Sequence, residues 1–200
     1  MGLTAAERLC LDLAWQAFGA GSVPVGAVVL CESGTVVSSG RSRMYETRAP
    51  TPEIANSILA HAEVNALVKL DPRRRYEHHT LVTTLEPCPL CAGALAMSTI
   101  GRLTFLGADP YGGAVGRLAN TAHTARVPVQ VSGPRRDAVG TLASCCTWPI
   151  TCSATRAVPW SASTRSTART SSRRGALSSS KAPGTRRVTR CCAPPCSTVC

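Results

Sequence analysis

An apolar repeat runs through residues 5–142 of this 200-residue chain and then stops, which limits what can fold. Thr4 and Glu7 form a capping-box pattern ahead of apolar residues at helical spacing, which end at Gly19. Later segments alternate between β-branched runs and 3.6-residue repeats. In chain order we expect a helix over 4–18, strands over 23–31 and 35–40, a helix over 58–70, a strand over 81–86, a helix over 88–97, and strands over 102–109 and 127–133. This order predicts an α/β domain in which helices cover a mixed sheet.

The C-terminal part of the chain has a different composition. Residues 144–200 contain nine Lys or Arg and no Asp or Glu, whereas residues 1–143 contain 13 and 11. The formal charge of +11 therefore belongs almost entirely to residues 144–200. Because such a segment buries too little apolar surface to offset its chain entropy, we predict a folded domain over 1–143 and a disordered basic tail over 144–200. Out-of-frame translation would produce the same abrupt change in composition.

Two short clusters near predicted helix starts carry the residues best suited to chemistry. His61-Ala62-Glu63 supplies an imidazole, and the segment Pro87-Cys88-Pro89-Leu90-Cys91 supplies two thiols one helical turn apart. Two thiolates and a neutral imidazole balance the charge of Zn²⁺ and leave one tetrahedral position open. We therefore predict a zinc site made by His61, Cys88 and Cys91, whose open position takes a water of lowered pKa.

Glu63 lies two residues beyond the predicted ligand His61, which suits it to moving protons rather than to binding the metal. It would take a proton from the water, pass it to a substrate nitrogen and then protonate a departing amine. The alternative is a structural zinc site, which needs a fourth ligand. The candidates for that ligand lack ligand spacing: His78, His79, His123, Cys10 and Cys31. A thioredoxin-like role for the two cysteines leaves His-Ala-Glu unexplained.

Over residues 5–135 the chain resembles the cytidine/deoxycytidylate deaminase superfamily, and within it the branch of tRNA adenosine deaminases and guanine deaminases. The matching segments are VPVGAVV (23–29), HAEVNAL (61–67), TLEPCPLCAGAL (84–95) and GADPYGGAVG (107–116). The resemblance implies a cytidine-deaminase-like three-layer α/β fold with a five-stranded mixed sheet, zinc between two helices and Glu63 as the proton shuttle. It also implies a homodimer and substrate contacts from Ala27, Ser42, Ala62 and Pro87.

Two departures from the family pattern bear on the substrate. Relatives that act on tRNA usually have an Asn in a G-H-N-R-like segment that holds the sugar, whereas this chain has Gly40-Arg41-Ser42-Arg43. Those relatives also end in a helix with basic and aromatic residues, which the low-complexity tail replaces here. We therefore predict a zinc-dependent hydrolytic deaminase that releases ammonia from a free nucleobase or nucleoside. Adenosine in tRNA is the alternative substrate.

Several arginines bear on whether the protein binds nucleic acid. Arg41, Arg43 and Arg48, together with the run 73–75, either contact phosphates or form a solvated surface. An inactive deaminase scaffold that binds nucleic acid through its basic tail is therefore a further hypothesis. The sequence contains neither a signal-peptide pattern nor an apolar run long enough to span a bilayer, so we predict a cytoplasmic protein that does not bind membranes.

Overall fold

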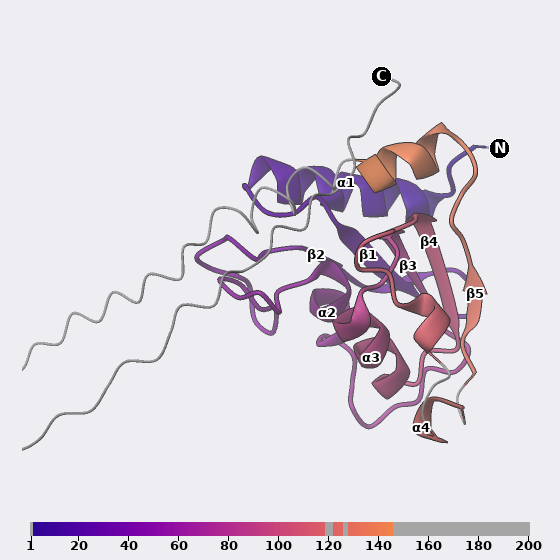
Figure 1. Ribbon diagram of the computed structural model, residues 1–200. Coiled ribbons are helices and arrows are strands. Elements are labelled where there is room, and N and C mark those ends of the chain that lie inside the picture. Colours follow the sequence, from indigo (N-terminus) through magenta and orange to yellow (C-terminus); the bar gives the residue numbers. More distant parts are fainter. Residues whose placement is uncertain (1, 119–121, 126–127, 146–200) are drawn as a thin grey trace, which may run out of the picture. The chain divides into compact units, whose positions relative to one another are not determined.

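The computed structural model describes residues 2–118, 122–125 and 128–145 (Figure 1). Almost all of the predicted tail, 144–200, lies outside these residues. The elements in chain order are α1 (Ala5–Gly19), β1 (Gly26–Leu30), β2 (Val36–Arg41), α2 (Ala62–Leu67), β3 (Thr80–Leu85), α3 (Pro89–Met97), β4 (Arg102–Gly107), the 3-10 helix η1 (Val115–Arg117), α4 (Ala122–Ala125) and β5 (Gln130–Ser132). Residues 138–145 are also helical.

The five strands form one mixed sheet in the order β2-β1-β3-β4-β5. Strand β1 pairs antiparallel with both β2 and β3, whereas β3, β4 and β5 run parallel to one another. The short turn between β1 and β2 needs Gly34, whose φ of 84° is a conformation that side chains rarely adopt. The predicted mixed five-stranded sheet is therefore confirmed.

Helices cover both faces of the sheet, as Figure 1 shows for α1 on one side and for α2 and α3 on the other. Val28 and Val82 pair across β1 and β3 and pack with Cys10 of α1. Their neighbours Val29 and Leu81 belong to the larger core on the opposite face. This alternation follows from the two-residue repeat of a strand, and it gives the three layers that the resemblance implies.

Strand β2 and helix α2 approach each other unusually closely at Gly40. A Cβ atom at this position would lie 2.4 Å from both the carbonyl oxygen of Ala62 and the backbone nitrogen of Ala66. Only a residue without a side chain therefore allows this contact. The start of α2, where the first predicted metal ligand lies, is held against the sheet by this packing.

Several elements are shorter than the sequence pattern predicts, including the strands expected over 102–109 and 127–133, which are Arg102–Gly107 and Gln130–Ser132. The helix expected over 58–70 is limited to Ala62–Leu67, because the carbonyl of Ala60 accepts a hydrogen bond from the N–H of Arg43 instead of continuing a helix. The strand expected over 23–31 begins only at Gly26. Pro24 has no N–H to donate, and the N–H of Val25 turns back to the carbonyl of Val23.

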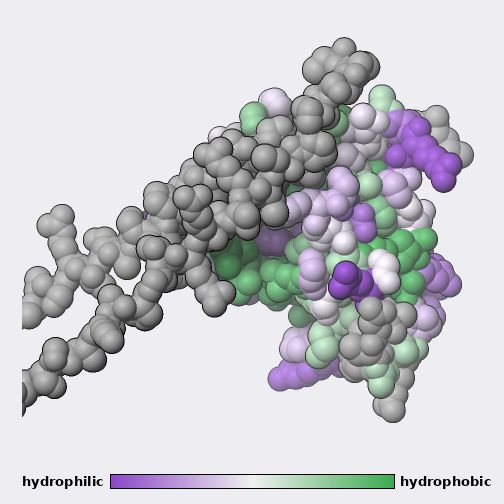
Figure 2. All heavy atoms as spheres, viewed as in Figure 1, coloured by the Kyte–Doolittle hydropathy of each residue, from purple (hydrophilic) through white to green (hydrophobic). Residues whose placement is uncertain are grey.

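The outer surface is mixed in character. On the face shown in Figure 2, exposed hydrophobic residues lie in separate areas between polar ones. None of the helices in the described part of the chain combines the length and the apolar character needed to cross a bilayer.

Candidate metal centre and active-site pocket

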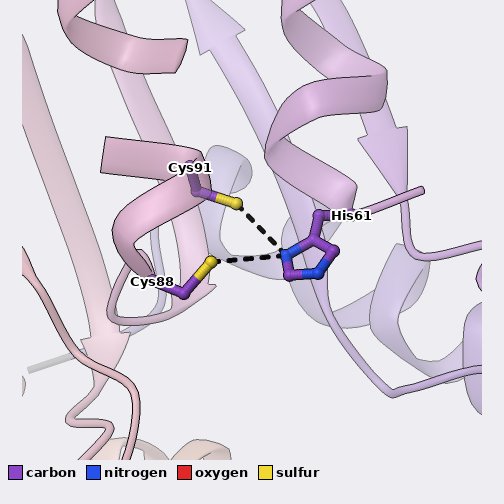
Figure 3. A group of neighbouring side chains, drawn as sticks. All are labelled: His61, Cys88 and Cys91. Carbon is purple, nitrogen blue, oxygen red and sulfur yellow. Dashed lines mark hydrogen bonds between the residues drawn. The ribbon is translucent and has the colours of Figure 1, made fainter. Parts of the chain in front are cut away.

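The two motifs that the sequence singles out meet at the starts of two neighbouring helices. His61 is the N-cap of α2, and Cys88 is the N-cap of α3, which directly follows β3. Pro89 occupies the first turn of α3, where its missing N–H costs no hydrogen bond. Cys91 lies one turn further along α3, so both thiols point towards α2 (Figure 3).

The three predicted metal ligands form one compact group. The His61 Nδ1 atom lies 3.5 Å from Cys88 Sγ and 3.3 Å from Cys91 Sγ (Figure 3). One ligand atom from each residue lies within 4.8 Å of the others. Imidazole nitrogen with two thiolate sulfurs is a donor set that zinc prefers, and three protein ligands leave a fourth position open. The geometry therefore fits the predicted zinc ion.

The electrostatics of the metal-free group favour a thiolate at Cys88. Hydrogen bonds with Cys91 and then with His61 lower the pKa of Cys88 to about 4. The pKa of Cys91 is raised, because its thiol holds a proton next to Cys88 and is also buried. The hydrogen bond to Cys88 raises the pKa of His61. Cysteine binds zinc as a thiolate, so the Cys91 proton would leave if these residues held the ion.

Glu63 lies in the first turn of α2 and is almost completely buried, with 3% of its surface exposed. The Thr83 hydroxyl of β3 donates to its Oε1 at 3.3 Å, and the Cys91 thiol donates to its Oε2 at 3.3 Å. Burial raises the pKa of the Glu63 carboxyl. A carboxyl group of raised pKa beside the three ligands is suited to exchanging protons near neutral pH.

A pocket of about 570 Å³ opens onto this group. The surface that lines it is mostly apolar, which is typical of a small-molecule site. The lining residues are Val23, Val25, Ser42, Met44, Tyr45, Ile58, His61, Glu63, Leu85, Glu86, Cys88, Asp109, Tyr111 and Gly112. The metal group and Glu63 therefore lie beside a space that a single base or nucleoside can enter.

Of the four predicted substrate contacts, Ser42 lines the pocket. Ser42 is 2% exposed, and its Oγ has no hydrogen-bond partner within the described protein. Ala27 of β1, Ala62 of α2 and Pro87 are buried, and they are not among the residues that line the pocket. Their roles stay predictions.

Four of the alternative ligands for a structural zinc site, Cys10, Cys31, His78 and His79, lie outside the His61, Cys88 and Cys91 group. The Cys10 thiol donates to the carbonyl of Val82 at 3.3 Å. Cys31, His78 and His79 line a separate cavity of about 530 Å³. The His123 side chain lies outside the described residues. Within residues 2–118, 122–125 and 128–145, the candidate metal group has three members, which favours an open site over a closed structural one.

A loop after β4 forms one wall of the pocket, and no role was predicted for it from the sequence. The backbone N–H of Glu86 donates to Gly107 O at 2.8 Å, and its Oε2 accepts from the Asp109 N–H at 3.3 Å. The Ala114 N–H donates to Pro87 O at 2.9 Å. The segment GADPYGG contains this loop, but the pairing of distant backbone groups leaves no local pattern that shows its place in the pocket.

Two of the arginines considered as phosphate contacts, Arg41 and Arg43, have partners inside the domain. Arg41 and Arg43 both pair with Glu46, with 2.7 Å between Arg43 Nη1 and Glu46 Oε2. Arg43 also pairs with Glu53, and 6% of the Glu53 side chain is exposed. These two arginines therefore complete an internal ion-pair network, which leaves them less suited to binding phosphate.

Comparison with known proteins agrees with the geometry. Residues 3–107, more than half of the chain, match the family described as the cytidine and deoxycytidylate deaminase zinc-binding region. The chain is similar to the tRNA(Ile)-lysidine synthase of Deinococcus deserti, with 35% identity over 130 residues, which are 62% of this chain and 23% of that protein. It is also similar to the tRNA-specific adenosine deaminase of Bacillus subtilis (strain 168), with 34% identity over 130 residues, which are 62% of this chain and 75% of that protein.

Among solved structures, one from a study of A-to-I editing by tRNA:A34 deaminases is 28% identical to this chain and superimposes with a TM-score of 0.58. The match covers 74% of this chain and 99% of that chain. The sequence match, the shared fold and the His/Cys/Cys group agree with one another. The chain belongs to the cytidine and deoxycytidylate deaminase family, whose zinc-binding region corresponds to residues 3–107.

Proposed function

We propose that this protein is a zinc-dependent hydrolytic deaminase that releases ammonia from a free nucleobase or nucleoside. The observation that carries the proposal is the buried Glu63 carboxyl, which lies 3.3 Å from Cys91 Sγ beside the three-ligand group. When bound, zinc supplies the Lewis acidity that lowers the pKa of water at the open position. His61, Cys88 and Cys91 would hold the ion, and their combined charge of −2 would neutralise it.

Glu63 moves the protons in this proposal. Its carboxylate accepts a proton from the attacking water, whose oxygen forms a bond to the ring carbon that bears the amino group. Glu63 then delivers that proton to the neighbouring ring nitrogen. The second water proton passes to the amino nitrogen, the carbon–nitrogen bond breaks, and ammonia leaves a keto product. The Thr83 hydroxyl holds Oε1 of the carboxylate by a hydrogen bond during these transfers.

A free base or nucleoside is the proposed substrate class because of the charge around the pocket. Glu63, Glu86 and Asp109 line it, whereas none of its described lining residues is Lys or Arg. Arg41 and Arg43, which precede and follow Ser42 in sequence, are engaged by Glu46 and Glu53. A neutral ring with N–H donors suits such a site better than a phosphorylated one.

Adenosine in tRNA is the second candidate substrate, and the rim of the pocket supports it. Tyr111 is 80% exposed, Ile58 77% and Tyr45 50%, and all three line the pocket. Exposed aromatic rings stack on unpaired bases in single-stranded RNA. The tRNA-specific adenosine deaminase of Bacillus subtilis is also 34% identical over the matched region. An RNA loop would then place one base in the pocket and neighbouring bases on the rim.

Ammonia release from a panel of cytosine, cytidine, adenosine, guanine and tRNA tests both candidates on the zinc-loaded protein. Turnover of a free base or nucleoside supports the first candidate, and turnover of tRNA alone supports the second. No ammonia from any member of the panel with stoichiometric zinc would contradict the enzyme proposal and favour the inactive scaffold. Size-exclusion chromatography on the same sample tests the predicted homodimer. The cytoplasmic location stays a prediction.

The variant Glu63→Gln tests the role of the carboxyl on whichever panel member is turned over. We expect it to retain zinc and to lose about 10²- to 10⁴-fold in kcat, which is the usual contribution of a positioned proton-transfer group. Glu77→Gln is the matched control, because it makes the same change in an exposed carboxyl that pairs with Arg75. Unchanged turnover in the Glu63 variant would contradict the proposed proton transfers.

A further inference from the structure

The chain between β2 and α2 forms a long segment without helix or strand, which we call the strap (residues 42–60). Four residues of the strap line the pocket: Ser42, Met44, Tyr45 and Ile58. A segment without regular backbone pairing opens easily unless other contacts hold it. The shape of the pocket therefore depends on what fixes the strap.

The side chain of Asn65 holds the middle of the strap. Its Oδ1 accepts from the Ile54 N–H at 2.7 Å, and its Nδ2 donates to the Ile54 carbonyl at 3.1 Å. The same Nδ2 donates to the Arg41 carbonyl at 3.1 Å, at the end of β2. Asn65 is fully buried, so both of its N–H donors and its carbonyl are used where water cannot replace them. One side chain thus ties the strap to the sheet.

Asn65 also belongs to the helix that carries the metal ligand and the proposed proton shuttle. The Asn65 N–H donates to the His61 carbonyl at 2.9 Å, one helical turn below it. The strap is therefore attached to the same short helix, α2, that positions His61 and Glu63. A shift of about 1 Å between these parts is enough to impair a site that must hold a substrate in a productive geometry.

Ion pairs hold the strap beside Asn65. Glu53 precedes Ile54, and its carboxylate pairs with Arg43 within the strap and with Lys69 at 2.5 Å, just after α2. With 6% of its side chain exposed, Glu53 is screened from solvent more than a surface ion pair is. These ion pairs hold the strap through the side chain of Glu53, whereas Asn65 holds it through the backbone of Ile54.

We propose that Asn65 is a positioning residue, which holds the strap in the conformation that completes the substrate pocket. The effect on catalysis rests on the proposed deaminase function, whereas the effect on the strap does not. The side chain of Asn65 does not line the pocket, and its three hydrogen bonds all end on backbone atoms of Arg41 and Ile54 rather than on a metal-ligating side chain. Its contribution to the reaction is therefore indirect.

The matched control is Ser38→Ala. The Ser38 hydroxyl is buried and donates to the Ala66 carbonyl at 2.9 Å, so it also joins β2 to α2. Ser38 does not contact the strap in any described hydrogen bond. A purely structural role of Asn65 predicts that both variants loosen the domain in the same way. The positioning role predicts that Asn65→Ala acts selectively on the strap.

The experiment measures hydrogen–deuterium exchange, zinc content and steady-state kinetics on full-length Asn65→Ala, Ser38→Ala and wild-type protein. In Asn65→Ala we expect amide exchange over residues 43–58 to accelerate by about tenfold or more, with zinc content unchanged, because three buried hydrogen bonds are lost. On the panel substrate we expect KM to rise about tenfold with kcat changed much less. Ser38→Ala should change neither the exchange over residues 43–58 nor KM.

Unchanged exchange over residues 43–58, or faster exchange spread evenly through the domain as in a general loss of stability, would overturn the proposal. If Asn65→Ala does not fold, Glu53→Gln serves as the second variant, because it weakens the ion pairs that hold the strap and leaves α2 intact. It should then accelerate exchange in the strap alone. If no panel member is turned over, the deaminase proposal fails and the exchange data still decide the role of Asn65.

Discussion

Replacement of Gly40 by Ala tests whether close packing between β2 and α2 supports the metal centre. The added Cβ would lie 2.4 Å from the Ala62 carbonyl oxygen and 2.4 Å from the Ala66 nitrogen. Ordinary non-bonded contacts are about 3.5 Å, so α2 must move by about 1 Å to accept one methyl group. The atoms in the way are backbone atoms, which cannot rotate aside.

The expected cost follows from two opposing effects. Overpacking of this kind typically costs about 1–3 kcal/mol, whereas Ala in place of Gly restricts the unfolded chain and returns about 0.4–1 kcal/mol. A net loss of about 1–2 kcal/mol corresponds to a decrease in Tm of about 2–8 °C for a domain of this size. Because α2 begins directly after His61, the shift should also weaken zinc binding.

Thermal unfolding and zinc content, measured on the purified protein, provide the assay. Gly93→Ala adds the same methyl group on the exposed side of α3, where nothing lies within 4 Å of the new atom. This control should retain zinc and gain up to about 1 kcal/mol from helix propensity. If the free energy of unfolding of Gly40→Ala lies within about 0.5 kcal/mol of the wild-type value and the variant keeps its zinc, this contact does not support the metal centre.

Three further predictions concern Cys88, the reactivity of Cys31 and Cys10, and the ion pair between Arg135 and Asp137. Cys88→Ala should lose zinc and stability together, because it removes one of three ligands; metal analysis and the Tm with and without a chelator measure this. Hydrogen bonding to Ser33 lowers the pKa of the half-buried Cys31 to about 7, whereas burial raises the pKa of Cys10 to about 12. Peptide mapping after iodoacetamide treatment should therefore find Cys31 modified at neutral pH and Cys10 protected in the folded protein. Hydrogen bonds from Arg135 lower the pKa of Asp137 to about 2, below the value of about 3.9 for an unfolded chain. The ion pair, with 2.5 Å between Arg135 Nη2 and Asp137 Oδ2, should stabilise the fold above about pH 4 and lose this effect as the pH falls through about 2. The Tm of Asp137→Asn, compared with the wild type at pH 5 and pH 2, should differ less at the lower pH, and equal differences would contradict this account.

Much of the metal centre could be predicted because its geometry is local. Cys88 and Cys91 are three residues apart at a helix start, so helical geometry alone directs both sulfurs to one side. The prediction that α2 extends over 58–70 was wrong, because Ala60 is bound to Arg43, 17 positions earlier. The hydrophobic periodicity of a sequence gives no information about a hydrogen bond between backbone groups far apart in the chain.

The same division applies to the pocket. The family pattern singled out Ser42. Tyr111, by contrast, reaches the pocket on the loop after β4, which is hydrogen-bonded through the Asp109 N–H to Glu86, just before α3. Arg41 and Arg43 look like phosphate ligands in the sequence, and in the fold they pair with acidic residues of the strap. The sequence does not reveal which acidic residue pairs with each arginine, because tertiary contacts decide which opposite charge lies nearest.

By itself, the sequence determined the order of the main helices and of the five strands, the three candidate metal ligands, the neighbouring Glu63 and the break in composition after residue 143. These features depend on residue type and on spacing within one or two helical turns. Only the tertiary structure decided where α2 begins, which residues surround the substrate space and how Asn65 holds the strap. Those features arise from contacts between segments far apart in the chain, where most buried polar groups, such as the Asn65 side chain, are paired with backbone of another segment.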